Sequence, residues 1–201
     1  MGQYYKPLLK EKGAKNWKGF YSWDFDNGAK LMEHSYIGNS FVSYIKKLIL
    51  HKKMQVVWAG DYADGEKGKM TLYGDERNLY DLSNTETPKD KSVSQEELAK
   101  MLYVVNHTKR QYVDYSKVEK DEYGYRIDPM PLLCAEGNGR GGGDYHGSAM
   151  NLIGSWARDL ISVESEIPNG YTELVPSFRE GEESDIIATQ RLKGSQSVYC
   201  S

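Results

Sequence analysis

A glycine-rich stretch over residues 137–147 constrains the fold of this sequence more than any other feature, with six glycines in eleven residues. It follows directly on a short apolar run, Leu-Leu-Cys, at residues 132–134. Glycine at this density disfavours both helix and strand, because ordering its backbone costs conformational entropy that no side-chain packing offsets. The stretch therefore predicts a loop that begins where a buried segment ends.

Such a loop can turn several backbone N–H groups toward one point and hold an anion or the backbone of a partner. The candidate ligand- or partner-binding residues are the loop and the side chains that follow it: Gly137, Asn138, Gly139, Arg140, Gly141, Gly142, Gly143, Asp144, Tyr145 and His146. A mobile surface loop that binds nothing is an alternative of equal weight.

The same stretch spells the G-x-G-x-x-G of dinucleotide-binding proteins at Gly137, Gly139 and Gly142. That fingerprint requires the loop to open into a helix whose N-terminus meets the pyrophosphate. The glycines that follow it resist a helix, and no parallel strand–helix–strand pattern accompanies it, so a dinucleotide site is not predicted. A nucleotide held by Arg140 and the glycine amides stays open as an alternative.

Length, charge and composition exclude several classes of protein. A chain of 201 residues suits one domain, and 26 basic against 29 acidic residues give a net charge of -3, which argues against direct binding to nucleic acid. No long apolar run suggests a signal peptide or membrane span, so we expect a cytoplasmic protein. The histidines and acidic residues show no metal-ligand spacing. We therefore expect no metal and no cofactor, and a non-enzymatic protein is favoured.

The cysteine and aromatic content bears on the core and on recognition. The two cysteines, Cys134 and Cys200, do not indicate a disulfide framework, and Cys134 is predicted to be buried. Sixteen tyrosines and four tryptophans stand against only four phenylalanines. Tyrosine and tryptophan combine an apolar body with a polar tip, which favours a surface for protein–protein interaction.

Two helices are predicted from apolar spacing and capping residues. Asn39 or Ser40 can cap the first, which ends near residue 50 and buries residues at three- and four-residue spacing. Ser94 and Glu97 form a capping box for the second, which runs to about Tyr103. The second helix is expected to bury Leu98, Met101 and Leu102.

The remaining pattern predicts short strands and long loops. The clearest strand covers residues 54–59, and late strands are expected over 156–163 and 171–175. Residues 62–90 are interpreted as an elaborated loop region that can hold one short strand, with short apolar islands, one of them at 70–73. Two prolines, Pro129 and Pro131, are expected to exclude a helix between residues 128 and 131.

The sum is one α+β domain over residues 1–178, with a mainly antiparallel sheet, about two helices and long loops. Residues 179–201 carry several acidic side chains and few apolar ones. They are predicted to form a mobile tail that orders, if at all, on a partner.

Four segments of the chain carry a resemblance to a known group of proteins. They are Met-Gly-Gln-Tyr-Tyr-Lys-Pro at 1–7, Leu-Met-Glu-His-Ser at 31–35, Val-Trp-Ala-Gly-Asp-Tyr at 57–62, and the glycine-rich residues 137–144. With these, most of residues 1–178 resembles small proteins encoded by phages and mobile elements of gut bacteria. The resemblance assigns no catalytic residue.

The resemblance implies an accessory protein, since small phage proteins of this kind include inhibitors of CRISPR and other bacterial immune systems. We therefore predict a phage-type accessory protein that binds a bacterial host protein, an effector or a nucleoprotein complex, in the cytoplasm of the host cell. The alternative is a nucleotide-binding sponge or a nucleotide-directed hydrolase that uses the loop at 137–143.

Overall fold

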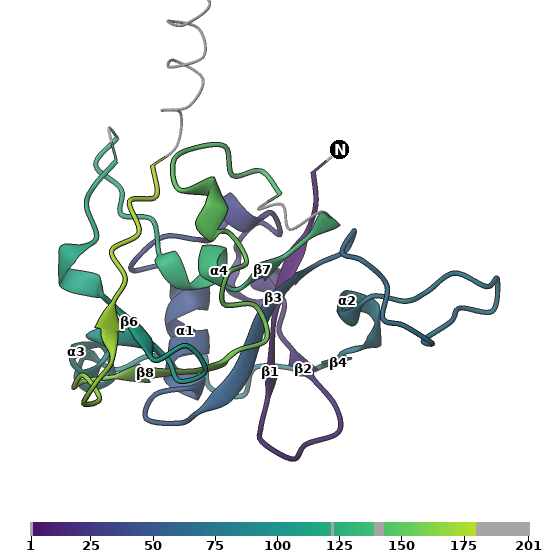
Figure 1. Ribbon diagram of the computed structural model, residues 1–201, viewed down its shortest axis with the longest axis horizontal. Helices are drawn as coiled ribbons and strands as arrows, with labels where there is room; N and C mark the ends of the chain where they lie inside the picture. The colour runs from purple at the N-terminus through teal and green to yellow at the C-terminus, as the bar shows by residue number, and fades with distance from the viewer. Residues whose placement is uncertain (1, 122, 139–142, 180–201) are drawn as a thin grey trace, which may run out of the picture.

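A mixed sheet of nine strands organises the structure, a computed structural model that describes residues 2–121, 123–138 and 143–179 (Figure 1). The strands are β1 (Tyr5–Lys10), β2 (Lys18–Gly19), β3 (Met54–Gly60), β4 (Asn84–Thr85), β5 (Tyr103–Asn106), β6 (Gln111–Asp114), β7 (Ala135–Glu136), β8 (Leu160–Glu164) and β9 (Thr172–Glu173). Their order is β4-β2-β1-β3-β8-β5-β6-β9, and β7 pairs with β3.

Most neighbouring strands in this sheet are antiparallel, while β2–β4, β3–β7 and β6–β9 are parallel pairs. The longest strands, β1 and β3, pair along six residues from Tyr5–Gly60 to Lys10–Gln55. The predicted α+β class with a mainly antiparallel sheet is confirmed, although the sheet is larger than the sequence suggested. The strand predicted at 54–59 is β3.

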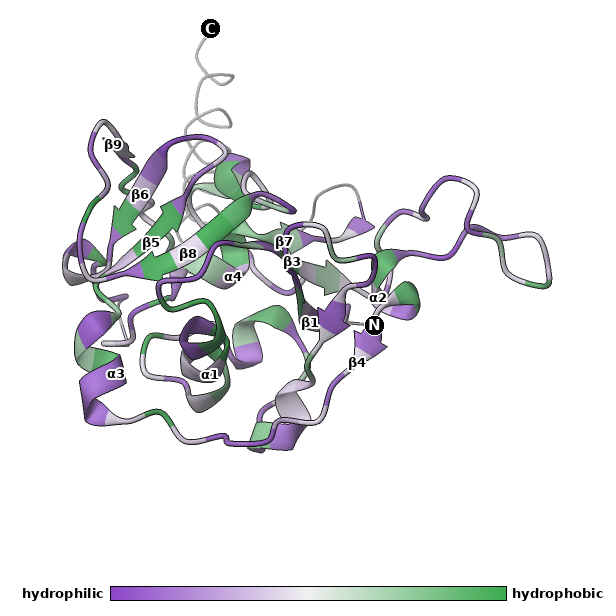
Figure 2. Cartoon of the chain, turned by 90° about the horizontal axis from the view of Figure 1, so that it is seen from below, coloured by the Kyte–Doolittle hydropathy of each residue, from purple (hydrophilic) through white to green (hydrophobic). Residues whose placement is uncertain are grey.

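The described residues hold four α-helices rather than about two. These are α1 (Ser40–Leu48), α2 (Leu79–Leu82), α3 (Gln95–Lys100) and α4 (Pro129–Leu133), with short 3-10 turns η1 (Ser22–Phe25), η2 (Leu31–Glu33), η3 (Tyr115–Lys117) and η5 (Met150–Leu152). Figure 2 shows α1 and α3 on one side of the strands β5, β6 and β8. None of the helices in the described ranges is long and apolar enough to cross a bilayer.

The predicted first helix is confirmed as α1. Asn39 Oδ1 accepts hydrogen bonds from the backbone N–H of Phe41 at 3.0 Å and of Val42 at 3.2 Å, which satisfies two donors that the first turn leaves open. Phe41 and Ile45 on its inner face are completely buried. The helix therefore supplies the main apolar cover of this face of the sheet.

The predicted second helix begins as expected but ends earlier. Ser94 and Glu97 form the capping box, and α3 stops at Lys100 because the chain enters β5 at Tyr103. Met101 is buried, whereas Leu98 and Leu102 are 37% and 44% exposed. The predicted burial of the two leucines was wrong, since a helix of six residues places little of its surface against the body.

The expectation that prolines exclude a helix near residue 130 was also wrong. Pro129 opens α4, and the side chain of Asp128 caps it by accepting from the backbone N–H of Met130 at 3.1 Å. Pro131 also lies in the first turn, where backbone N–H groups have no partner within the helix. Both prolines therefore cost α4 no hydrogen bond.

The late strands are shorter than predicted, while the predicted burial of Cys134 is confirmed. β8 begins at Leu160 because residues 156–159 form turns, and β9 covers only Thr172–Glu173. Cys134 is fully buried, as expected. Of the predicted acidic tail only Arg179 is described, and its backbone N–H donates to Ser148 Oγ at 3.0 Å. The tail over 180–201 lies outside the described residues.

Candidate partner-binding site

The glycine-rich stretch leaves β7 and enters the body again at Gly143. Gly137 is buried and Asn138 exposed, while Gly139, Arg140, Gly141 and Gly142 lie outside the described residues. Gly143 has a left-handed φ of 61°, and a Cβ there would stand 2.6 Å from Cε2 of Tyr5. A side chain at this position would both strain the backbone and clash with the Tyr5 ring.

The described residues that follow Gly143 are used mainly inside the fold. Asp144 Oδ1 accepts from the backbone N–H of Met32 at 3.0 Å, and burial raises the pKa of Asp144. The Tyr145 ring is buried, and its hydroxyl donates to the carbonyl of Ser148 at 2.6 Å. His146 is exposed. Asp144 and Tyr145 thus attach the end of the loop to the body.

Gly137 lies in the wall of a polar cleft of about 480 Å³. The charged side chains that line the cleft are four carboxylates and two cations: Asp64, Glu66, Glu136, Asp159, Lys109 and Arg158. Both cations are paired within the cleft. Lys109 Nζ lies 3.6 Å from Asp159 Oδ2, and Arg158 pairs with Glu66 and Glu136. An entering phosphate would therefore meet an excess of negative charge, which opposes its binding at this part of the cleft.

Arg158 joins two elements of the cleft. Its Nε donates to Glu136 Oε2 at 2.6 Å, and its Nη1 donates to Glu66 Oε2 at 3.3 Å. Arg158 has a left-handed φ of 66°, an uncommon conformation for a residue with a side chain. The two carboxylates raise the pKa of the Arg158 guanidinium above its already high value, so the side chain is a permanent cation between them.

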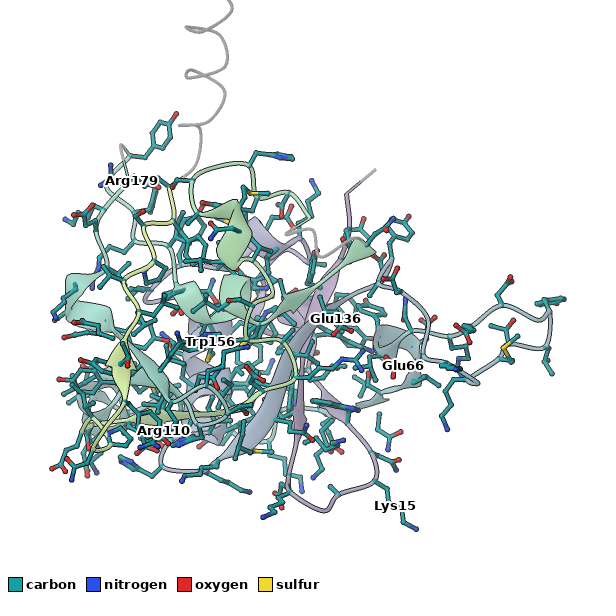
Figure 3. All side chains as sticks on the ribbon, in the orientation of Figure 1. Lys15, Glu66, Arg110, Glu136, Trp156 and Arg179 are labelled. Atoms are coloured by element: carbon teal, nitrogen blue, oxygen red, sulfur yellow. The ribbon has the colours of Figure 1, made fainter. Side chains whose placement is uncertain are left out.

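Glu66 belongs to an arm, residues 64–77, that projects from the body between β3 and α2 (Figure 1). Backbone hydrogen bonds hold its two sides together, from Glu66 N to Arg77 O at 2.8 Å and from Arg77 N to Lys69 O at 2.6 Å. Figure 3 shows Glu66 and Glu136 on the side of the body from which the arm projects. Arg158 therefore fastens the base of the arm to β7.

The tip of the arm, residues 70–74, exposes apolar side chains to solvent. Leu72 is 102% exposed, Tyr73 is 93% exposed and Met70 is 54% exposed. Figure 2 shows hydrophobic colour at the far end of the otherwise polar arm. Exposed apolar groups gathered on a projecting element are typical of contact sites, because their burial against a partner is favourable by about 25 cal/mol per Å².

The apolar island at 70–73 lies outside the site predicted from the sequence. The sequence does carry a signal for it, since Met70, Leu72 and Tyr73 stand within a segment rich in charged residues and glycine. An apolar island in a long polar loop has no core to face. Its exposure is therefore the expected outcome.

One cluster of polar side chains, His107, Ser162 and Glu164, is linked by hydrogen bonds within the fold. His107 Nε2 lies 2.7 Å from Ser162 Oγ, but Ser162 is fully buried and its hydroxyl donates to Glu164 Oε1 at 2.5 Å. A hydroxyl committed to a carboxylate and closed to solvent is not placed to attack a substrate. In the described parts of the chain, no group of three His, Cys, Asp or Glu side chains is arranged to hold a metal ion.

Comparison of the chain with protein-family models, with curated proteins and with solved structures found no match. The arm exposes apolar side chains, whereas the cleft holds the protein's own ion pairs.

Proposed function

We propose that this protein acts by binding another protein, and that the tip of the arm is its main contact. The observation that supports this proposal is the exposure of Leu72 and Tyr73 at the end of a hydrogen-bonded projection. In keeping with the resemblance to phage-encoded proteins, the proposed partner is a bacterial host factor such as an immune effector, met in the cytoplasm of the host cell.

The chemistry of the arm specifies the surface that would receive it. Tyrosine is enriched among the residues that dominate binding energies, and Leu72 adds apolar area beside it. Lys67, Lys69, Asp75 and Glu76 are exposed around the tip. An apolar pocket with a polar rim that carries both signs of charge would therefore complement the tip.

A nucleotide ligand is the competing proposal, and it depends on Arg140, outside the described residues. The two proposals differ in what they require. Partner binding requires the arm and is indifferent to Arg140, whereas nucleotide binding requires Arg140 and is indifferent to the arm.

The experiment is capture of partners from a bacterial lysate by the full chain, in three forms. The wild type is compared with a double variant, Leu72→Ser with Tyr73→Ser, and with Val175→Ser, which removes an exposed apolar side chain away from the arm. We expect the wild type and Val175→Ser to retain the same host protein, and the double variant to bind it at least tenfold more weakly.

Equal retention by the double variant would exclude the arm as the contact. A parallel thermal-shift series with nucleotides and cyclic oligonucleotides tests the alternative. Stabilisation by a nucleotide that Arg140→Ala abolishes, with no host protein retained, would overturn the proposal in favour of a nucleotide-binding protein.

A further inference from the structure

A second cavity, separate from the arm and the polar cleft, opens between α1, α3 and η3. Its volume is about 400 Å³. Pockets that enclose small organic ligands span about 300–1,000 Å³, so the cavity is large enough for one. Its walls combine apolar side chains with a few polar ones, and the two kinds come from different elements.

The apolar part of the wall comes from α3 and from the loop before α1. Leu98, Met101 and Leu102 line it together with Ile37. Leu98, in α3, is 37% exposed, and Leu102, two residues beyond the end of α3, is 44% exposed. Both line the cavity, so an apolar group bound there would cover them.

A buried lysine lies in the wall formed by α1. Lys46 is only 5% exposed, and its ammonium pairs with Asp128 and lies 3.8 Å from the centre of the Tyr115 ring. Asp128 is fully buried and accepts at Oδ1 from the Tyr115 hydroxyl at 3.2 Å. Buried charge of this kind persists because its partners are fixed by the fold.

Lys46 lines the cavity, and its ammonium has N–H donors that Asp128 does not use. An ammonium has three N–H donors, and a buried donor without an acceptor costs free energy. Asp128 is the one oxygen-bearing partner of Lys46 among the described residues. An oxygen acceptor brought by a ligand would therefore be favoured beside Lys46.

A second cation, Arg126, lies in the same wall. Its Nε donates to the carbonyl of Val118 at 3.1 Å and its Nη2 to the carbonyl of Tyr115. Carbonyl groups orient a guanidinium without neutralising it, and no carboxylate in the described ranges forms an ion pair with Arg126. The wall also holds one carboxylate, Asp114, whose Oδ1 accepts from the Ser116 hydroxyl at 2.6 Å, a contact that orients the carboxylate and leaves its charge in place.

We propose that this cavity binds a small amphipathic carboxylate, with its apolar body against Leu98, Met101 and Leu102 and its carboxylate toward Lys46 and Arg126. The apolar wall excludes a strongly hydrated ligand. Asp128 offsets the charge of Lys46, so the anionic head is favoured by Arg126, which has no carboxylate partner in the described ranges, and by the unused N–H donors of Lys46, against the single carboxylate of the wall, Asp114. The inference is independent of the arm.

Calorimetric titration of the full chain with octanoate, octanol and octylamine tests the charge preference. The three probes share an eight-carbon chain and differ in the head group. We expect octanoate to bind at least tenfold more tightly than octanol, and octylamine to show no binding. Equal binding of all three, or no binding of octanoate, would overturn the proposal.

Variants at the cavity locate the site. Arg126→Gln keeps the capacity to donate hydrogen bonds but removes the charge, and Leu98→Glu places a carboxylate at the partly exposed wall. We expect each to weaken octanoate binding at least tenfold, whereas Leu72→Glu, a matched change at the tip of the arm, leaves it unchanged. Unchanged affinity in Leu98→Glu would show that octanoate binds elsewhere.

Lys46 needs a compensated variant, because its removal alone leaves Asp128 buried without a cation. The double variant Lys46→Met with Asp128→Asn replaces the ion pair by neutral side chains of similar size. Circular dichroism and thermal unfolding establish that it folds, and octanoate binding should then be lost. Wild-type affinity in a folded double variant would remove Lys46 from the site.

Discussion

The arm exposes apolar side chains to solvent, whereas the core of this protein buries polar ones. The tip of the arm exposes Leu72 and Tyr73 to water, whereas the core encloses Lys46, Asp128 and His34 away from it. The buried groups have partners within the chain, whereas no residue that the structure describes covers the exposed apolar groups of the tip. The difference teaches that the ion pair and hydrogen bonds of the core hold the fold together, with donors of Lys46 left for the proposed ligand, while the apolar tip is suited to contact with something outside the fold.

The largest effect is expected from breaking the buried pair. Asp128→Ala removes the carboxylate that pairs with Lys46 and caps α4, leaving an uncompensated charge in the core. We expect a loss of about 3–5 kcal/mol in the free energy of unfolding, measured by urea denaturation. A loss below about 1 kcal/mol would mean that the pair is not buried in solution as the structure places it.

The next effect concerns the buried histidine. Trp58 Nε1 donates to His34 Nε2 at 3.2 Å, and His34 Nδ1 lies 3.1 Å from the Gly28 carbonyl oxygen, so the ring fits as a neutral imidazole. Burial lowers the pKa of His34 to about 4. The unfolded chain, with the ordinary histidine pKa of about 6.5, therefore takes up the proton first as the pH falls.

The His34 contribution is complete above the unfolded pKa and is lost as the pH falls from about 6.5 toward 4. At about 1.4 kcal/mol per pKa unit, the stability lost by pH 4 amounts to about 3 kcal/mol. Urea denaturation across this range measures it. His34→Gln, which keeps an acceptor for Trp58 but does not titrate, should lose less stability over the same interval. Parallel curves for the two proteins would contradict the assignment.

A smaller effect is expected where the arm meets the body. Arg158→Gln leaves Glu66 and Glu136 without their shared cation, and because the pair is partly exposed we expect a stability loss of about 1 kcal/mol. Hydrogen exchange should quicken over residues 64–77 and stay unchanged in α1. Unaltered exchange in the arm would show that its backbone hydrogen bonds alone hold it in place.

The smallest effect on stability is expected at the tip. Leu72→Ser removes an apolar side chain that is fully exposed, so the midpoint of urea unfolding should move by no more than corresponds to about 0.5 kcal/mol. A destabilisation above about 2 kcal/mol would indicate that Leu72 packs against the body. Together with loss of partner capture, an unchanged stability would separate binding from folding at this residue.

Much of the secondary structure was predictable, because its signals are local. Asn39 and the apolar spacing after it marked α1, and Ser94 with Glu97 marked the start of α3. The expectation that Pro129 excludes a helix was wrong, because a proline disrupts a helix interior but is tolerated in a first turn. Asp128 caps that first turn. Of the predicted binding residues, Gly137 does line a cleft, whereas Asp144 and Tyr145 proved to be engaged within the fold.

The sequence by itself determined the α+β class, the capped helix α1 and the central strand β3, since capping and periodicity act within a few residues of chain. Only the tertiary structure decided that Glu66, Glu136 and Arg158 meet, and that Leu72 stays exposed while Lys46 is enclosed. Contact and burial depend on which distant segments the sheet brings together, and that information is not contained in any local stretch of sequence.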